Sequence, residues 1–312
     1  MSADGPDATI AEARPQLGRQ GRRWGEDGIK LLLLLCAALS IATTVGIIVA
    51  LVQPAIEFFR EVNFIDFISG TRWAPLFTPS SFGVLPLIVS TFALTFWAAL
   101  VFIPFGLGAA IFLSEYARPG VRRVLKPALE ILAGIPTVVF GFFALAFFTP
   151  LLQDFGLGLE TFNILGAGLV IGVMLIPTVA SISEDAMAAV PHDLRAGAYA
   201  LGATRVHVAT RVVVPAAFSG IIASYILAIS RALGETVVAL IAAGTIARIT
   251  FNPEEGAASM AAFIAATGIG DVPTGSIEYK TIFAVGLTLF AFTLVMNTFS
   301  TRLVRRYREV YE

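Results

Sequence analysis

The chain has 312 residues, of which 57% are hydrophobic and only 14% are charged, and its mean hydropathy is +0.83. Soluble domains carry about 25% charged residues, so this composition excludes an ordinary soluble protein and favours a polytopic membrane protein. The net charge of −1 gives no support for a nucleic-acid partner.

Six charge-poor stretches predict six transmembrane helices, because crossing about 30 Å of hydrocarbon takes roughly 20 residues at 1.5 Å per residue. We therefore expect an all-α fold with a membrane domain over 29–301, a disordered polar tail over 1–28 and a basic tail over 302–312. The spans are expected at about 29–52, 83–113, 128–152, 161–183, 214–243 and 280–301.

The first stretch, Leu31–Val52, follows basic residues as a signal peptide would. It is longer than the apolar core of a typical signal peptide and has no evident cleavage site, so we interpret it as a retained span. The single cysteine, Cys36, excludes an intramolecular disulfide and is expected to be an ordinary apolar position.

Lysine and arginine predict the orientation of these spans. Of the 21 basic residues, 16 fall in one set of segments and four in the other, with Arg231 inside a span. The richer set contains both ends of the chain, so both termini should be cytoplasmic. The stretches 53–81 and 244–279 should then be extracytoplasmic.

No catalytic, metal or cofactor site is predicted. None of the three lysines follows a glycine, so there is no G-x-x-x-x-G-K phosphate loop, and any ATP used must bind another subunit. His192 and His207 lie 15 residues apart without a metal-ligand spacing or a neighbouring nucleophile.

Several residues inside the spans suggest packing or bending. Gly168 and Gly172 form a G-x-x-x-G in the fourth span, which permits close helix approach. Spans two, three and four are interrupted by Pro104, Pro136 and Pro177, respectively. These prolines predict kinks, which either serve alternating access or are static bends. Structural or pathway roles are both open for three further polar residues, Glu130, Thr137 and Glu184.

The loop over 184–213 predicts a short helix followed by a turn. Pro191 and Asp193 suit a first helical turn, and Gly202 suits the left-handed position that ends a helix. Ala196, Gly197, Ala198 and Ala200 give the helix a small-residue face, either for insertion into a partner's groove or simply for helicity.

Arg231 and Glu235 stand out in the fifth span. An Arg at mid-bilayer costs roughly 2.5–3.5 kcal/mol and is rarely retained without a purpose. We expect the two residues to lie one helical turn apart and to form an ion pair when no substrate is bound. The alternative is a buried pair that only fixes helix packing.

Four segments resemble a known family of permeases. They are Phe82–Ile88, Glu130–Gly141, Ser181–Ala186 and Ser230–Thr236, and together they are similar to the PstC-type permease of the phosphate-specific ABC importers from about Trp73 onward. The Trp73-Ala74-Pro75 and Phe82-Gly83-Val84-Leu85-Pro86 entry favours PstC over the sister permease PstA.

The loop over 184–213 also resembles the "EAA" loop of ABC-importer permeases. Gly202, nine residues, Val212, one residue, Val214 and Pro215 keep its spacing. Ala196 stands at the family's Glu position and Gly197 at its first Ala, which puts in doubt any salt bridge made there but not the docking.

The resemblance implies a permease subunit without cofactors in the bacterial plasma membrane. It would pair with a homologous PstA-like permease or a second copy, bind two copies of an ATPase, and receive phosphate from an extracytoplasmic binding protein. The implied residues are Ser230, Arg231, Glu235 and Thr236 in the pathway and Asp193, Leu194, Gly197, Ala198, Leu201 and Gly202 in ATPase coupling.

Other readings remain open. Sulfate or molybdate is an alternative oxyanion. A secondary transporter should show inverted repeats, which are not evident, and a membrane sensor or scaffold would leave Arg231 unexplained.

Overall fold

The computed structural model describes residues 24–306 and divides the chain into two units, Met1–Ala50 and Leu51–Glu312. Helix α1 (Trp24–Glu61) begins in the first unit and ends in the second. It includes 24–28, which we expected to be disordered, and extends beyond the predicted end at 52, with Pro54 inside it. The predicted tails at 1–23 and 307–312 lie outside the described residues.

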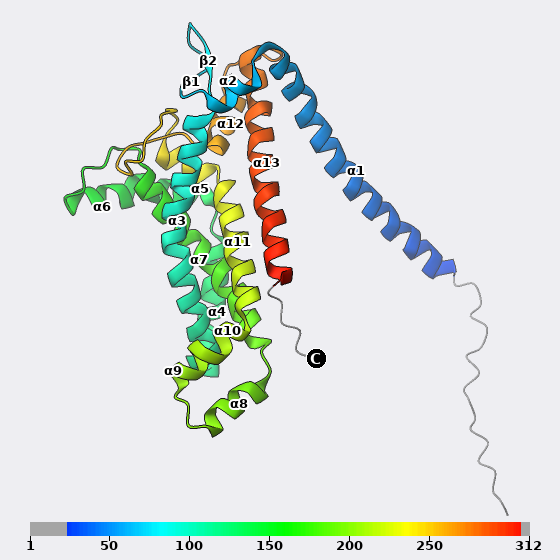
Figure 1. Cartoon of the computed structure of the whole chain (residues 1–312), viewed down its shortest axis with the longest axis vertical. Helices are drawn as coiled ribbons and strands as arrows, with labels where there is room; N and C mark the ends of the chain where they lie inside the picture. Colours follow the sequence, from blue (N-terminus) through cyan, green and yellow to red (C-terminus); the bar gives the residue numbers. More distant parts are fainter. Residues whose placement is uncertain (1–23, 307–312) are drawn as a thin grey trace, which may run out of the picture. The chain divides into compact units, whose positions relative to one another are not determined.

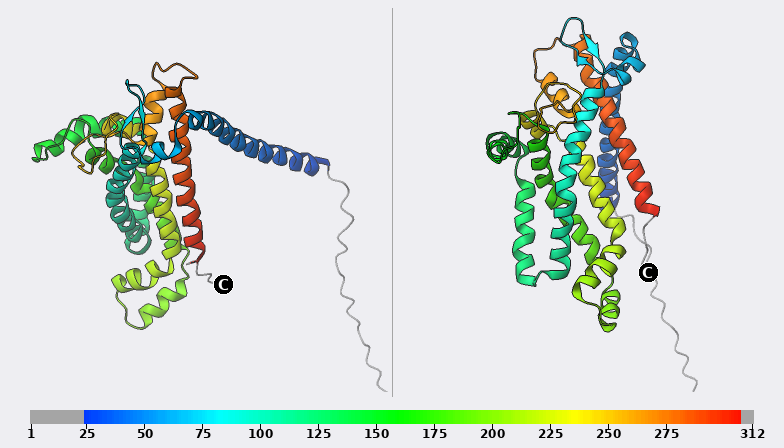
Figure 2. Two further views of the ribbon diagram at one scale, coloured as in Figure 1. Left: turned by 45° about the horizontal axis from the view of Figure 1, so that its top comes forward. Right: turned by 60° about the vertical axis from the view of Figure 1, so that its left-hand side comes forward.

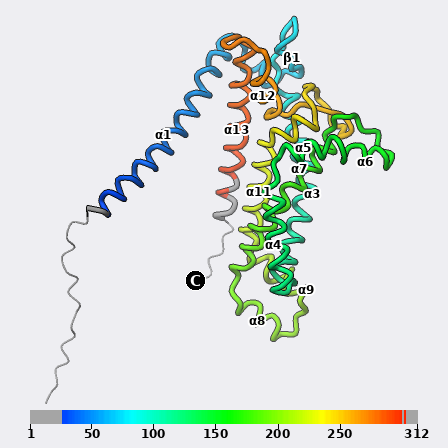
Figure 3. The backbone as a smooth tube through the Cα atoms, turned by 180° about the vertical axis from the view of Figure 1, so that it is seen from behind, coloured from blue at the N-terminus to red at the C-terminus, as the bar shows by residue number. Residues whose placement is uncertain are grey.

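The second unit is a bundle of long helices with short elements at both ends (Figure 1). At one end, α8 and α9 lie beyond the long helices; at the other lie α2, the β1–β2 hairpin and α12 (Figure 3). The elements are α2 (Phe64–Ser69), β1 (Trp73–Ala74), β2 (Ser81–Phe82), α3 (Leu85–Ile111), η1 (Phe112–Tyr116), α4 (Pro119–Gly134), α5 (Thr137–Phe143), η2 (Ala144–Phe148), α6 (Thr149–Asp154), α7 (Ile164–Ala188), α8 (His192–Ala200), α9 (Arg205–Val208), η3 (Ala209–Val213), α10 (Val214–Ala216), α11 (Phe218–Leu233), η4 (Ala239–Ala243), α12 (Met260–Gly268) and α13 (Ile277–Arg306).

Among the described residues, five helices are long and apolar enough to cross a membrane, or six if one bent pair counts as a single span. The bent pair joins Arg205–Ala216, most of which lies in the predicted loop over 184–213, to α11 of the predicted fifth span, at 72°. The bend lies at Ala217, between α10 and α11, so the continuous helix predicted from 214 is wrong at this point.

Span three also departs from a single straight helix. Helix α4 ends at Gly134, and Pro136 precedes α5 in extended backbone conformation. The chain then leads sideways from the bundle to α6 (Figures 1 and 2). Pro104 and Pro177 behave differently, because α3 and α7 continue through them.

Helix α7 forms the centre of the bundle, and 15 of its 25 residues are buried. Its glycines permit the close approach that we predicted. A Cβ at Gly168 would lie 2.7 Å from the Cβ of Trp97, and one at Gly172 would lie 2.7 Å from the carbonyl oxygen of Ala98. The interpretation of G-x-x-x-G as a packing motif is therefore confirmed for the contact between α7 and α3.

Two further apolar clusters hold the ends of the bundle. The cluster beside the hairpin buries Phe58, Phe67, Trp73 and Met260, among others. The ring of Phe67 makes edge-to-face contacts with both Phe58 and Trp73. At the α8 end, Met187, Val208 and Ile221 belong to a separate buried cluster. The second cluster fixes the short helices that follow α8 against α7 and α11.

Candidate functional site

Arg231 lies near the end of α11 and is exposed on the bundle surface. Its Nη1 donates a hydrogen bond to Oγ1 of Thr178 in α7, at 3.4 Å. The preceding residue, Ser230, is bonded to Oδ1 of Asn297 in α13, at 2.7 Å. The guanidinium therefore has one hydroxyl partner and remains accessible, as an oxyanion-binding group requires.

Glu235 does not share a helix with Arg231. Helix α11 ends at Leu233, Gly234 follows as its C-cap, and Oε1 of Glu235 accepts hydrogen bonds from the backbone N–H groups of Val237 and Val238, both at 3.2 Å. The predicted continuous helix is wrong because glycine weakens it and the carboxylate caps a new helical segment. In place of the expected ion pair, Glu235 satisfies backbone groups.

Thr236 lies inside this break, and its hydroxyl donates to the carbonyl oxygen of Gly234 at 3.0 Å. Thr137 lies at the other break, at the start of α5. Both predicted residues therefore belong to interruptions of a membrane-spanning segment, where freed backbone groups need local partners.

A cavity of about 270 Å³ lies between α4 and α7 and adjoins Arg231 through Thr178. Glu130, Ser181 and Glu184 also line it. Most of its wall is apolar, including Leu129 and Pro177.

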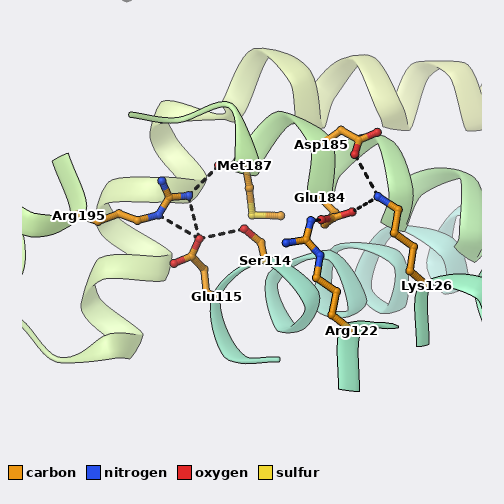
Figure 4. A network of polar contacts seen from close by, with 8 residues as sticks. All are labelled: Ser114, Glu115, Arg122, Lys126, Glu184, Asp185, Met187 and Arg195. Atoms are coloured by element: carbon orange, nitrogen blue, oxygen red, sulfur yellow. Dashed lines mark hydrogen bonds and ion pairs between the residues drawn. The ribbon is translucent and has the colours of Figure 1, made fainter. Parts of the chain in front are cut away.

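Glu184 is fully buried and ion-paired to two residues of α4 (Figure 4). Lys126 Nζ lies 2.8 Å from its Oε2, and Arg122 pairs with Oε1. A buried carboxylate is costly unless it is paired and hydrogen-bonded. This pairing fastens α4 to α7, and Glu184 also lines the cavity.

Helix α8 corresponds to the predicted coupling helix, and it has no buried residue. Gly202 has φ of +80°, which confirms the left-handed turn. Leu201 is 91% exposed, and Asp193, Leu194, Ala196, Gly197 and Ala200 are also exposed. Ala198 instead packs against the buried cluster at this end of the bundle, so the expectation that it belongs to the outward small-residue face is wrong.

Arg195 fastens α8 to the bundle, a role that the sequence did not reveal. Its Nη1 donates to the carbonyl oxygen of Val190 at 2.6 Å, and its Nη2 donates to that of Met187 at 2.8 Å. Nη2 also lies 3.0 Å from Oε1 of Glu115, which accepts a further bond from Ser114 (Figure 4). The contacting residues are up to 80 positions apart, so no local pattern predicts them.

The opposite end contains a second ion-paired cluster. Glu160, before α7, accepts a backbone hydrogen bond from Gly256 at 3.0 Å and pairs with Arg248 at 2.7 Å. The hydrogen bond from Gly256 lowers the pKa of the Glu160 carboxyl most, and the contact with Arg248 lowers it further. Arg248 also pairs with Glu255, so the cluster joins two loops at the start of α7.

Comparison with known families identifies the chain. Residues 103–309 match the family described as binding-protein-dependent transport system inner membrane component. The chain belongs to this family. Its members are inner membrane components, in agreement with the apolar helices described above.

Two curated relatives of this family member align over most of both chains. A probable ABC transporter permease protein, YqgH, of Bacillus subtilis is 35% identical and covers 91% of this chain and 94% of its own length. The phosphate transport system permease protein PstC of Pasteurella multocida is 30% identical, with coverages of 84% and 86%.

Solved structures show the same fold in distant proteins. The crystal structure of a bacterial alginate ABC transporter in complex with an alginate pentasaccharide-bound periplasmic protein contains a chain with a TM-score of 0.63 and 16% identity. It covers 92% of this permease and 98% of that chain. A chain of the inward-facing MetNI methionine ABC transporter aligns with a TM-score of 0.55, 18% identity and coverages of 73% and 95%.

Proposed function

We propose that this permease subunit forms part of the translocation pathway for inorganic phosphate in an ATP-driven importer. Arg231 carries the proposal. An arginine on the exposed face of a membrane-embedded helix is costly in lipid, so it is expected to face a water-filled pathway or a second subunit. Its planar fork of N–H donors suits a tetrahedral oxyanion better than a lysine point charge would.

The neighbours of Arg231 support a transient oxyanion contact. The guanidinium is hydrogen-bonded to the neutral Thr178 hydroxyl at 3.4 Å, and the carboxylate of Glu235 is occupied by backbone N–H groups. Phosphate therefore need not displace a strong ion pair in order to bind Arg231. The phosphate permeases among the relatives favour this anion over sulfate or molybdate.

The energy source is a separate ATPase that docks on α8. The exposed surface formed by Ala196, Gly197, Ala200 and Leu201 is the surface that we assign to this contact. Two copies of the ATPase, one for each permease, would match a pair of homologous permeases. A PstA-like partner would complete the pathway opposite Arg231, and an extracytoplasmic binding protein would deliver phosphate.

Transport by the complete complex tests this proposal. The permease is reconstituted in proteoliposomes with its ATPase, sister permease and binding protein, and uptake of radioactive phosphate is measured with and without ATP. Excess sulfate and molybdate serve as competitors. ATP-dependent phosphate uptake that neither competitor reduces is the expected result. Uptake of sulfate or molybdate in preference to phosphate would contradict the assignment.

A further inference from the structure

Side chains of α8 attach it to the bundle through an apolar contact at Ala198 and polar contacts at Arg195. None of the residues of α8 is buried, and Ala198 contributes only a partly buried contact with the adjacent cluster. The helix follows Pro191 and ends before the left-handed turn at Gly202. A force applied to its exposed face would therefore rotate α8 about these two points unless another contact resisted it.

Arg195 provides that contact. The exposed fraction of its side chain is 12%, and that of its partner Glu115 is 6%. Two of its bonds are made to the carbonyl oxygens of Met187, in the last turn of α7, and Val190, just beyond it. The Glu115 contact reaches η1, the continuation of α3. One guanidinium thus joins α8 to the ends of two long helices.

The chemistry of arginine suits this arrangement. Its planar group presents five N–H donors in fixed directions, so it can bond the two carbonyl oxygens and the carboxylate at once. Charge-assisted bonds of this kind are about twice as strong as neutral ones. The nearby ion pair between Glu184 and Lys126 also attaches α4 to α7 at this end of the bundle (Figure 4).

We propose that Arg195, paired with Glu115, is a positioning residue that makes α8 move together with the ends of α3 and α7, so that motion of the ATPase reaches the translocation pathway. This inference rests on the proposed function, because it assumes that α8 contacts the ATPase. Arg195 itself need not touch the ATPase or the substrate. Its loss should separate ATP hydrolysis from transport without preventing docking.

The test measures phosphate taken up per ATP hydrolysed by the complete transporter in proteoliposomes. Because Arg195→Met alone leaves Glu115 buried without its cation, the main variant is the double replacement Arg195→Met with Glu115→Gln. We expect this variant to reach the membrane and to copurify with the ATPase, while the uptake-to-hydrolysis ratio falls about tenfold, the scale of a typical coupling energy. Arg195→Lys should give an intermediate ratio, because an ammonium group cannot reproduce the planar fork.

Arg211→Gln serves as the matched control, since Arg211 is an exposed arginine of the same loop region. Its ratio should equal that of the wild type. An unchanged ratio in the double variant would overturn the inference, as would a proportional fall of uptake, hydrolysis and membrane abundance, which indicates a purely structural brace. Failure of the proposed function is distinguishable, because the wild-type complex itself would then show no ATP-dependent phosphate uptake.

Discussion

Arg231 and Glu235 are four residues apart in the sequence but lie on opposite sides of a helix end at Leu233 and Gly234. The arginine belongs to α11, whereas the carboxylate accepts the N–H groups of Val237 and Val238. This separation gives the two residues different tasks. Arg231 is available for an anion, and Glu235 stabilises the broken backbone.

Substitution of Arg231 should abolish most transport without loss of assembly. Arg231→Gln removes the charge from an exposed position, so membrane abundance should stay near that of the wild type while phosphate uptake nearly disappears. Arg231→Lys should recover little, because it lacks the planar fork. Uptake and abundance are measured together. Poor assembly of Arg231→Gln, restored by adding Glu235→Gln, would instead indicate a structural ion pair.

Uptake and stability should depend on the acceptor oxygen of Glu235 rather than on its charge. Glu235→Gln keeps an oxygen that can accept from Val237 and Val238, so uptake and stability should change little. Glu235→Ala removes the cap and should lower the free energy of unfolding by about 1 kcal/mol. Chemical unfolding of the detergent-solubilised protein measures this difference. Equal effects of the two replacements would contradict the capping role.

Substitutions on the exposed side of the α8 region should weaken ATPase binding more than substitutions on its inner side. Leu201→Glu places a charge on a side chain that is 91% exposed, and it should weaken capture of the purified ATPase by the permease. Ala198→Val, on the inner face, should affect permease stability instead, because Ala198 packs against the buried cluster. Wild-type ATPase capture by Leu201→Glu would remove this face from the docking surface.

The long helices and the glycine contact were predictable because they depend on local hydropathy and spacing. Gly202 was predictable for the same reason, since a left-handed turn after a helix favours glycine. The end of α4 before Pro136 is an interruption of the kind that this proline predicted. Two features were not predictable: the break after Leu233 and the clamp at Arg195. The break after Leu233 depends on Glu235 accepting backbone N–H groups, and Arg195 meets Glu115 only through tertiary packing.

Orientation remains a prediction from the basic residues, and both ends of the bundle offer exposed positions to test it. In a Cys36→Ser background, Phe77→Cys in the β1–β2 hairpin should react with an impermeant thiol reagent added to intact cells. Leu201→Cys should react only after permeabilisation. Phe77 and Leu201 are 70% and 91% exposed, so access within each compartment is comparable. The reverse labelling pattern would overturn the proposed orientation.

The contact between α3 and α7 should distinguish two glycine substitutions of identical chemistry. Gly172→Ala would place a Cβ 2.7 Å from the Ala98 carbonyl oxygen, a backbone atom that cannot move freely. Overpacking should cost about 1–3 kcal/mol, which exceeds the gain of about 1 kcal/mol from alanine's helix propensity. Gly108→Ala meets nothing within 4 Å and should be neutral or stabilising. Chemical unfolding in detergent compares them, and equal values would contradict close packing.

Glu160 should make the stability of the loop cluster depend on pH in the acid range. Its folded-state pKa is lowered from 4.5, first by the Gly256 backbone hydrogen bond and then by Arg248. A depressed pKa means that its stabilising contribution is complete above the unfolded pKa and is lost as the pH falls through the folded value. The melting temperature of the wild type should therefore exceed that of Glu160→Gln at pH 6, and the difference should shrink as the pH is lowered below 4.5. Glu254→Gln, an exchange of the same type in the neighbouring loop, controls for general acid effects. A difference that stays constant down to the lowest pH at which the protein remains folded would show that ionisation of Glu160 does not stabilise this cluster.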